Sequence, residues 1–374
     1  MQKLFGGIFA VLLLAVVIVA CSKNNSSDKP ADGFDRKALL THVADNIIIP
    51  AYSNFQTVFS EMKTAAAAFT AAPDAGKLAT LRTKWRSAYL AWQSVELFNF
   101  GPADNVLLRN YFNIYPTDVT LLRNHISTGG YDLETLTNNK VQGFPALDYL
   151  LNGAGSSDAQ ILTNYTAGTE AANWKKYLTD VVNTMSTKLD KVVADWKGSY
   201  RQQFVSNDGT GAGSPLSLMV NEYIMNFERF LRSGKFAIPA GVMSGTPVPE
   251  KVEAFYSKDL GIDLAKAALK ASRDFYLGKS FNGSTTGPGL QSYLQALGRN
   301  NANVATLATN IENQFGVLEA KMTALGNSVY DAIVSNRPAV LALYDEFQKQ
   351  VRYLKVDMTS AIGITVSYTD ADGD

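Results

Sequence analysis

Helical spacing of apolar residues along nearly the whole chain constrains the fold more than any other feature. Apolar side chains recur at steps of three and four, which places them on one face of an α-helix. The clearest example is the stripe Leu78, Leu81, Trp85, Ala88, Tyr89, Trp92 and Val95. Sustained alternation with a period of two occurs only over residues 362–368, as in a short strand or an extended tail. We therefore predict an all-α fold in which antiparallel helices pack as bundles.

A glycine-rich segment divides the helical stripes into two groups. Residues 206–214 have the sequence Ser-Asn-Asp-Gly-Thr-Gly-Ala-Gly-Ser, a composition that interrupts helices. We predict a first helical bundle over residues 34–205 and a second over residues 214–374. Hydrophobic residues make up 46% of the 374 residues, which is enough to bury a sizeable core.

The charge balance excludes one class of partner. The chain has 34 basic and 34 acidic side chains, so its formal net charge is zero. Proteins that bind nucleic acids usually carry a surplus of basic residues. We therefore predict that this protein has no nucleic-acid partner.

The first 33 residues indicate where the protein is located. Residues 4–20 are apolar or small and end in Ile18-Val19-Ala20-Cys21, which resembles the lipobox of bacterial lipoproteins, where the cysteine is acylated. We expect a signal peptide over residues 1–20, lipidation of Cys21 and a flexible tether over 21–33, rather than a transmembrane anchor. The lipid would hold the protein at a membrane surface of the cell envelope, periplasmic or outer-membrane associated.

Few residues offer metal or nucleophile chemistry. Cys21 is the only cysteine, which excludes a cysteine nucleophile, a Cys-ligated zinc site and an iron–sulfur cluster once it is lipidated. His42 and His125 are the only histidines, and they form no closely spaced zinc-binding pair. The sequence contains neither a GxSxG nucleophile elbow nor a Walker loop.

Two carboxylates stand in apolar surroundings. Glu96 follows Trp85, Tyr89 and Trp92 on one helical face, so it is either paired in the interior or reaches solvent where the stripe ends. Asp148 has almost only apolar neighbours in sequence. It either caps or pairs locally, or it belongs to a buried polar site.

These stretches resemble the imelysin family. The residues that carry the resemblance are Trp85, Tyr89, Trp92, Glu96-Leu97-Phe98-Asn99-Phe100-Gly101-Pro102, Ile114-Tyr115-Pro116 and Gly143-Phe144-Pro145-Ala146-Leu147-Asp148-Tyr149-Leu150-Leu151. Segments 227–241 and 253–257 are similar to later parts of that family, so the resemblance covers most of the chain from about residue 34. Imelysin-like proteins are bacterial envelope proteins classed as M75 peptidases. The resemblance implies two related four-helix bundles with a site at their interface.

The family motif Gly-x-His-x-x-Glu is altered in this chain. Gly143 matches, Pro145 replaces the histidine and Asp148 replaces the glutamate. Proline offers no lone pair to a metal, so the pair that could hold one cation on a helical face is lost. Metal-dependent hydrolysis needs an activated water at an open coordination position, so this departure argues against peptidase activity. Asp148 and Glu96 remain candidate oxygen ligands for a metal such as iron.

From this resemblance we expect a polar pocket between the bundles. Its expected lining is Glu96, Gly101, Pro102, Tyr115, Gly143 and Asp148, with Arg273 and Asp274 from the second bundle facing it. Asp148 would be the acidic anchor and Glu96 a second carboxylate. Arg273 would supply a cation for an anionic ligand or hold a carboxylate in place.

The resemblance suggests a function without catalysis. The family has been linked to iron acquisition, so we expect a non-catalytic binding lipoprotein that serves iron or haem uptake, with an outer-membrane uptake protein as a candidate partner. Two alternatives stay open. The protein could be an M75-type metallopeptidase whose metal is held outside the altered motif, or a structural lipoprotein that presents a helical surface to a partner.

Overall fold

A computed structural model describes residues 32–369 of the chain. The predicted signal peptide, the lipidation site Cys21 and most of the predicted tether lie outside these described residues. The described part is built from helices, and within it β-pairing is limited to one isolated bridge between Lys279 and Thr286. The predicted all-α fold is therefore confirmed.

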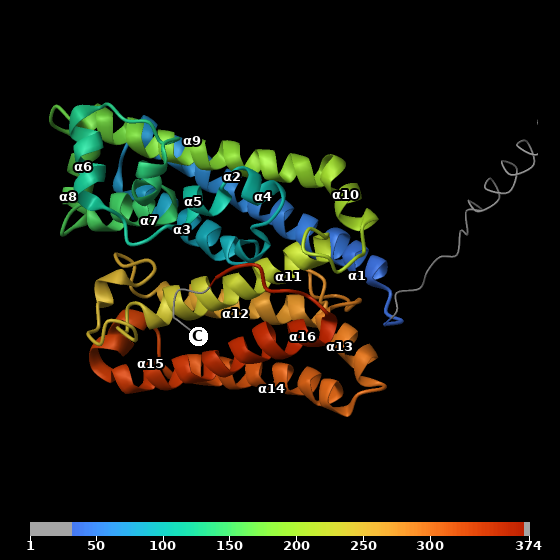
Figure 1. Ribbon diagram of the computed structural model, residues 1–374. Coiled ribbons are helices and arrows are strands. Elements are labelled where there is room, and N and C mark those ends of the chain that lie inside the picture. Colours follow the sequence, from blue (N-terminus) through green and yellow to red (C-terminus); the bar gives the residue numbers. More distant parts are fainter. Residues whose placement is uncertain (1–31, 370–374) are drawn as a thin grey trace, which may run out of the picture.

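The chain before the glycine-rich segment forms one layer of helices, coloured blue to green in Figure 1. Its α-helices are α1 (Arg36–His42), α2 (Ile49–Ala71), α3 (Ala75–Trp92), α4 (Pro102–Asn105), α5 (Leu108–Phe112), α6 (Val119–Thr128), α7 (Gly143–Asp148), α8 (Asp158–Thr166), α9 (Ala171–Asp195) and α10 (Arg201–Ser206). Its π-helical and 3₁₀ segments are η1 (Val43–Ile48), η2 (Glu96–Phe98), η3 (Leu136–Val141), η4 (Tyr149–Gly153) and η5 (Trp196–Tyr200).

The rest of the chain forms a second layer, yellow to red in Figure 1. Its α-helices are α11 (Pro215–Met225), α12 (Gly261–Leu277), α13 (Leu290–Gly298), α14 (Ala302–Ala324), α15 (Val329–Arg352) and α16 (Thr359–Ile362). The π-helical segments η6 (Asn226–Ala237) and η8 (Tyr353–Met358) extend α11 and α15, and η7 (Pro249–Lys251) is a 3₁₀ turn. The long helices here are α11–η6, α12, α14 and α15–η8, whereas in the first layer α2, α3 and α9 are joined by several short helices. A duplication of one bundle stays a prediction.

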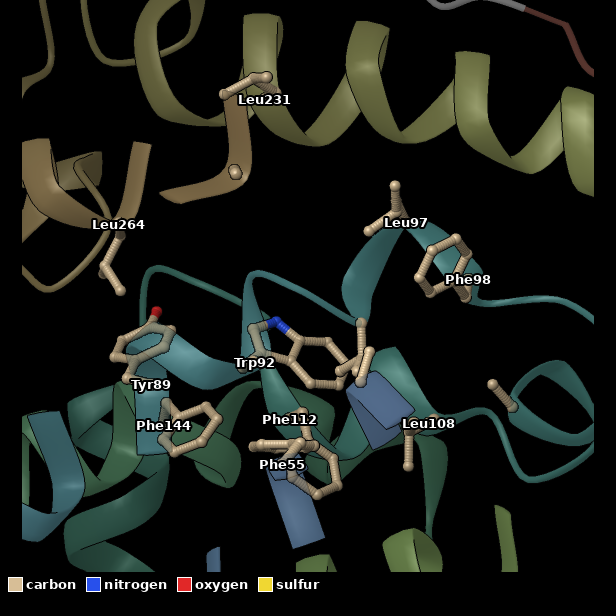
Figure 2. Packing of buried hydrophobic residues seen from close by; sticks show 14 of the residues in the cluster. Phe55, Tyr89, Trp92, Leu97, Phe98, Leu108, Phe112, Phe144, Leu231 and Leu264 are labelled. Atoms are coloured by element: carbon tan, nitrogen blue, oxygen red, sulfur yellow. The ribbon is translucent and has the colours of Figure 1, made fainter. Parts of the chain in front are cut away.

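The predicted stripes form the core because each stripe lies on one face of a helix. All apolar members of the stripe on α3 are buried, and the Asp74 side chain caps its first turn by accepting a hydrogen bond from the Lys77 N–H. Pro50 lies where α2 continues directly from η1, and the carbonyl of Asn46, four residues earlier, accepts a hydrogen bond from the Phe281 N–H at 2.8 Å instead. Phe55 from α2 then meets Trp92, Phe112 and Phe144 in an aromatic cluster (Figure 2).

The two layers meet along a seam. Helix α3 and the turn η2 at its end contact α12, α11 and η6 of the second layer. The aromatic cluster lies directly beneath η2, with Tyr89 stacked on Phe144 at 4.5 Å and Trp92 on Phe112 at 5.0 Å between ring centroids. Such stacking fixes the end of α3 and the start of α7, the two elements that bring Glu96 and Asp148 to the seam.

The last described residues form an extended tail, as the period-two pattern allowed. Asn221 on α11 holds this tail, because its amide donates to the Thr365 carbonyl and accepts from the Ser367 N–H. Across residues 32–369, no helix combines the length and the apolar character that crossing a bilayer requires.

Candidate functional site

Glu96 is buried at the seam rather than exposed at the end of its stripe. The helix α3 ends at Trp92, and the turn η2 carries Glu96 inward, where 3% of its surface is exposed. Its carboxylate lies 3.8 Å from Nε of Arg109 and accepts a hydrogen bond from the Asn113 amide at 3.3 Å. Of the two readings that the sequence left open, the structure selects the buried and paired carboxylate.

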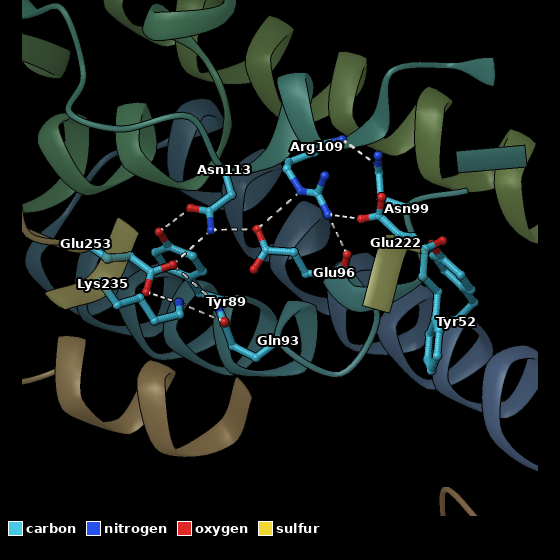
Figure 3. Close-up of polar contacts among 11 residues, drawn as sticks. Tyr52, Tyr89, Gln93, Glu96, Asn99, Arg109, Asn113, Glu222, Lys235 and Glu253 are labelled. Carbon is cyan, nitrogen blue, oxygen red and sulfur yellow. Dashed lines mark hydrogen bonds and ion pairs between the residues drawn. The ribbon is translucent and has the colours of Figure 1, made fainter. Parts of the chain in front are cut away.

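Arg109 is the centre of this buried group. Its guanidinium donates to the backbone carbonyl of Glu96 at 2.9 Å and to a carboxylate oxygen of Glu222 on α11 (Figure 3). The guanidinium carbon also lies 3.8 Å from the centroid of the Phe230 ring, which adds a cation–π contact. One arginine of the first layer is thus bonded to a glutamate of the second.

A second set of polar side chains extends this group along the seam. Asn113 accepts a hydrogen bond from the Tyr89 hydroxyl at 2.6 Å and donates to Glu253 at 2.8 Å. Lys235 on η6 pairs with Glu253 and donates to the Gln93 side chain at 3.0 Å. We call the residues Glu96, Arg109, Asn113, Glu222, Lys235 and Glu253 the seam network (Figure 3).

Burial changes the acidity of the seam network. Desolvation raises the pKa of Glu222 from 4.5 to about 7, although Arg109 opposes that shift. Desolvation also raises the pKa of Glu96, while Lys235 and Arg109 favour its charged form. Three carboxylates face only two cationic side chains here, so near pH 7 the balance of charge depends on the protonation of Glu222.

Asp148 lies in a different environment nearby. It is 1% exposed and sits at the end of α7, where it accepts hydrogen bonds from the Tyr256 backbone N–H at 2.8 Å and the Ser257 hydroxyl at 2.8 Å. The amide of Asn152 donates to it as well, at 3.1 Å. Desolvation raises the pKa of Asp148 to about 6, and hydrogen bonds from these neutral groups oppose the rise. Asp148 therefore ties α7 to the segment after η7 and is mostly ionised at pH 7.

Residues of both layers line a small open pocket beside Asp148, which we call the seam pocket. Its volume is about 190 Å³. The first layer contributes Tyr115, Thr117, Pro145 and Asp148, and the second contributes Glu250, Phe255 and Tyr256. A cavity of this size lies below the range of about 300–1,000 Å³ that drug-sized ligands occupy, so it is too small for haem.

The backbone geometry at position 143 explains why this residue of the altered motif is a glycine. Its φ is +79°, and an added Cβ would lie 2.5 Å from the Phe112 carbonyl oxygen. Only glycine fits this close approach of backbone to backbone. Gly143 therefore seats α7 on α5 and does not line the seam pocket.

Four other predicted site residues lie away from the seam pocket. Gly101 and Pro102 begin α4, and Gly101 packs so closely on Tyr200 that a Cβ would lie 2.0 Å from its hydroxyl oxygen. Arg273 pairs with Glu312 on α14, and Asp274 pairs with Lys270 and Lys279. The expectation that Arg273 and Asp274 face the pocket beside Asp148 is not met. Arg273 lines a cavity between α12 and α14, and Asp274 lines that cavity and a second one between the layers, where Leu90 and Phe98 belong to the first layer.

The residues at the altered motif do not fit a metal. Within residues 32–369, no three or more His, Cys, Asp or Glu side chains are grouped so that they could hold an ion. Asp148 and Glu96 share no hydrogen-bond partner, and each is already occupied by protein donors. The side chain of Pro145 lines the cavity with carbon only, so the position that is a histidine in the family motif offers no metal ligand here.

The sequence analysis missed most of the seam network. Arg109, Asn113 and Glu222 were not assigned to a site, and Lys235 and Glu253 entered only as parts of the family resemblance. A usable signal was present in Met219-Val220-Asn221-Glu222-Tyr223-Ile224, where a charge interrupts an apolar stripe. The pairing of Glu222 with Arg109, separated by 113 residues, could not be found without the fold.

Comparisons with known proteins agree with this architecture. A search of curated proteins finds no match. Among solved structures, a candidate iron-regulated protein A precursor from Parabacteroides distasonis superposes with a TM-score of 0.73 at 19% identity, covering 90% of this chain and 97% of that one. An imelysin-like protein from Psychrobacter arcticum superposes with a TM-score of 0.67 at 22% identity, covering 89% and 97%. The family model for imelysin, peptidase family M75, matches residues 48–358, so the chain belongs to the imelysin family.

Proposed function

We propose that this protein is a non-catalytic binding lipoprotein of the cell envelope that serves iron uptake, and that its ligand occupies the seam pocket. The observation that carries the proposal is the state of the altered motif. Pro145 supplies no ligand atom, and the Asp148 carboxylate is filled by the donors of Tyr256, Ser257 and Asn152. The positions that match the family motif therefore form part of the pocket wall and a contact between the two layers.

Three features support a role in iron uptake at the envelope. The chain belongs to the imelysin family, and one structural neighbour is named as iron-regulated. The residues up to Cys21 have the pattern of a lipoprotein signal. The seam pocket is small and its lining includes two carboxylates, which suits a small ligand rather than a haem or a polypeptide substrate.

A growth experiment tests the link to iron. A strain that lacks the gene is grown with an iron chelator and complemented with the wild type, with Asp148→Asn or with Cys21→Ala. We expect the wild type to restore growth, and both variants to restore it poorly, because one alters the pocket and the other removes the lipid site. Full complementation by both variants, or no growth defect in the deletion strain, would contradict the proposal.

A biochemical experiment tests the absence of catalysis. The purified protein is incubated with an unfolded protein substrate, with and without a chelator, and calorimetry compares ferrous, ferric and zinc ions on the wild type and on Asp148→Ala. We expect no chelator-sensitive cleavage and no metal binding that depends on Asp148. Cleavage abolished by the chelator would establish the metallopeptidase alternative instead.

A further inference from the structure

The charges around the seam pocket are unbalanced. Its lining contains two carboxylates, Asp148 and Glu250, and no lysine, arginine or histidine. Glu250 is exposed on η7 at the mouth, whereas Asp148 is buried at the base. A ligand that enters this pocket therefore meets negative charge both at the entrance and at the bottom.

Asp148 differs from the other buried carboxylates at the seam because its partners are neutral. Glu222 pairs with Arg109 and Glu253 pairs with Lys235, but Asp148 receives only a backbone N–H, a hydroxyl and an amide. Hydrogen bonds from neutral groups leave the full negative charge in place, and a buried charge of this kind is costly unless a cation approaches it. The protein thus holds an anionic group in its interior without supplying the counter-charge.

The remaining walls suit an organic cation. Tyr115, Phe255 and Tyr256 contribute aromatic rings to the lining, and aromatic faces attract ammonium and guanidinium groups. The neighbouring Lys258 already makes such contacts, with its ammonium 3.6 Å from the centroid of Tyr330 and 5.6 Å from that of Phe255.

The residue that precedes the aromatic wall of the pocket has a strained backbone conformation. Ala254 directly precedes Phe255, is buried, and has a φ of +55°, which a residue with a Cβ adopts only against a steric penalty. Strain of this kind persists where the surrounding structure enforces it and is concentrated at ligand-binding sites. Here it presents two successive aromatic residues, Phe255 and Tyr256, beside Asp148.

We propose that the seam pocket binds a small organic cation, an ammonium or guanidinium group on a short carbon chain, with Glu250 and Asp148 as its counter-charges. This inference rests on the proposed binding function and names its ligand class. A bare metal ion is disfavoured because the lining offers carbon-rich rings in place of a set of oxygen or nitrogen ligands. The volume of about 190 Å³ limits the ligand to a few non-hydrogen atoms beyond the charged group.

Binding of matched probes tests this inference. Ligand-observed NMR and calorimetry compare n-butylammonium and n-butylguanidinium with butanol and butyrate, at one ionic strength, on the wild-type protein. We expect saturable binding of both cations, weaker binding of butanol and none of butyrate. Equal binding of butanol, preference for butyrate, or no binding of either cation in the millimolar range would overturn the inference.

Variants locate the site and separate the charge effects. Glu250→Gln is exposed and should not affect folding, and we expect it to weaken cation binding about two- to fivefold. Asp148→Asn keeps an acceptor for its donors and should weaken binding about tenfold or more, because it removes the buried charge. Glu319→Gln, on α14 beside Arg273, is the control and should leave the affinity unchanged. Unchanged affinity in Glu250→Gln, together with unchanged affinity in any Asp148→Asn protein that folds, would overturn the inference.

The outcomes distinguish this inference from the proposed function. Chelator-sensitive cleavage would contradict the proposed function whether or not amines bind. If the protein cleaves no substrate and restores growth under iron limitation but shows no preference for cations, only the inference of an organic cation is contradicted, and the proposed function stands.

Discussion

The seam network and the seam pocket lie next to each other, but their buried carboxylates differ in whether a cationic side chain pairs with them. Glu253 belongs to the network and is paired with Lys235, whereas its sequence neighbours Val252 and Ala254 line the pocket. In the network each glutamate has a cation close by; in the pocket Asp148 has none. Carboxylates with a cation close by join the two layers, whereas a carboxylate with only neutral partners can attract the charge of a ligand.

The largest expected effect comes from removing Arg109, one of the two cationic side chains of the network. Arg109→Met leaves Glu222 buried without its ion-pair partner and removes one of the two cations near Glu96, so we expect a loss of about 3–5 kcal/mol in the free energy of unfolding. Urea denaturation measures the loss. The control is Arg86→Met, which breaks an exposed pair with Asp259 and should cost less than about 1 kcal/mol. Equal losses in the two variants would show that the network is not an essential connection.

The raised pKa of Glu222 in the seam network should make the stability of the protein depend on pH. The folded pKa of Glu222 is raised to about 7 from 4.5, so between these pH values the folded state retains a proton that the unfolded state releases. Stability is therefore lost as the pH rises from about 4.5 to 7, by about 3 kcal/mol at most, and Glu222→Gln should remove that part of the slope.

Denaturation at pH 5 and pH 8 measures this slope. The control is Glu346→Gln, because hydrogen bonding from Gln314 lowers the pKa of Glu346 and places its titration below pH 5. The control should keep the wild-type difference between the two pH values. If Glu222→Gln keeps that difference too, Glu222 does not titrate as proposed.

Removing the carboxylate of the pocket should have a smaller effect than removing Arg109. Asp148→Ala leaves the Tyr256 N–H and the Ser257 hydroxyl without an acceptor, but it also removes a buried charge, so we expect a loss of about 2 kcal/mol. Asp148→Asn should lose less, because its amide oxygen still accepts. Thermal and urea unfolding of the three proteins test this order, and a loss as large as that of Arg109→Met would mean that Asp148 is mainly a structural tie.

The smallest expected effect comes from a single donor to Asp148. Ser257→Ala removes one of three hydrogen bonds while two remain, so the expected loss is about 1 kcal/mol. Ser87→Ala, whose hydroxyl bonds only to its own helix at Thr83, is a control that should change little. A gain in stability in Ser257→Ala would show that this hydroxyl is strained rather than bonded.

The helical stripes and the family resemblance were predictable because they depend on local spacing and on short motifs. The stripe on α3 gave the buried face correctly, since a period of 3.6 residues places apolar side chains together wherever the helix packs. The motif around Gly143 and Asp148 also placed Asp148 beside Tyr115 at the seam. The placement of Arg273 and Asp274 failed because both faces of α12 make contacts, and the sequence does not say which face meets which neighbour.

Sequence alone determined that this chain folds as helices, that it belongs with imelysin-like proteins, and that position 145 offers no metal ligand. The tertiary structure decided which buried charges are neutralised. Arg109 meets Glu222, and Lys235 meets Glu253, across separations of 113 and 18 residues, while Asp148 meets only neutral donors. The electrostatic energy of a buried group depends on distances of a few ångströms, and those distances exist only after the helices have packed together.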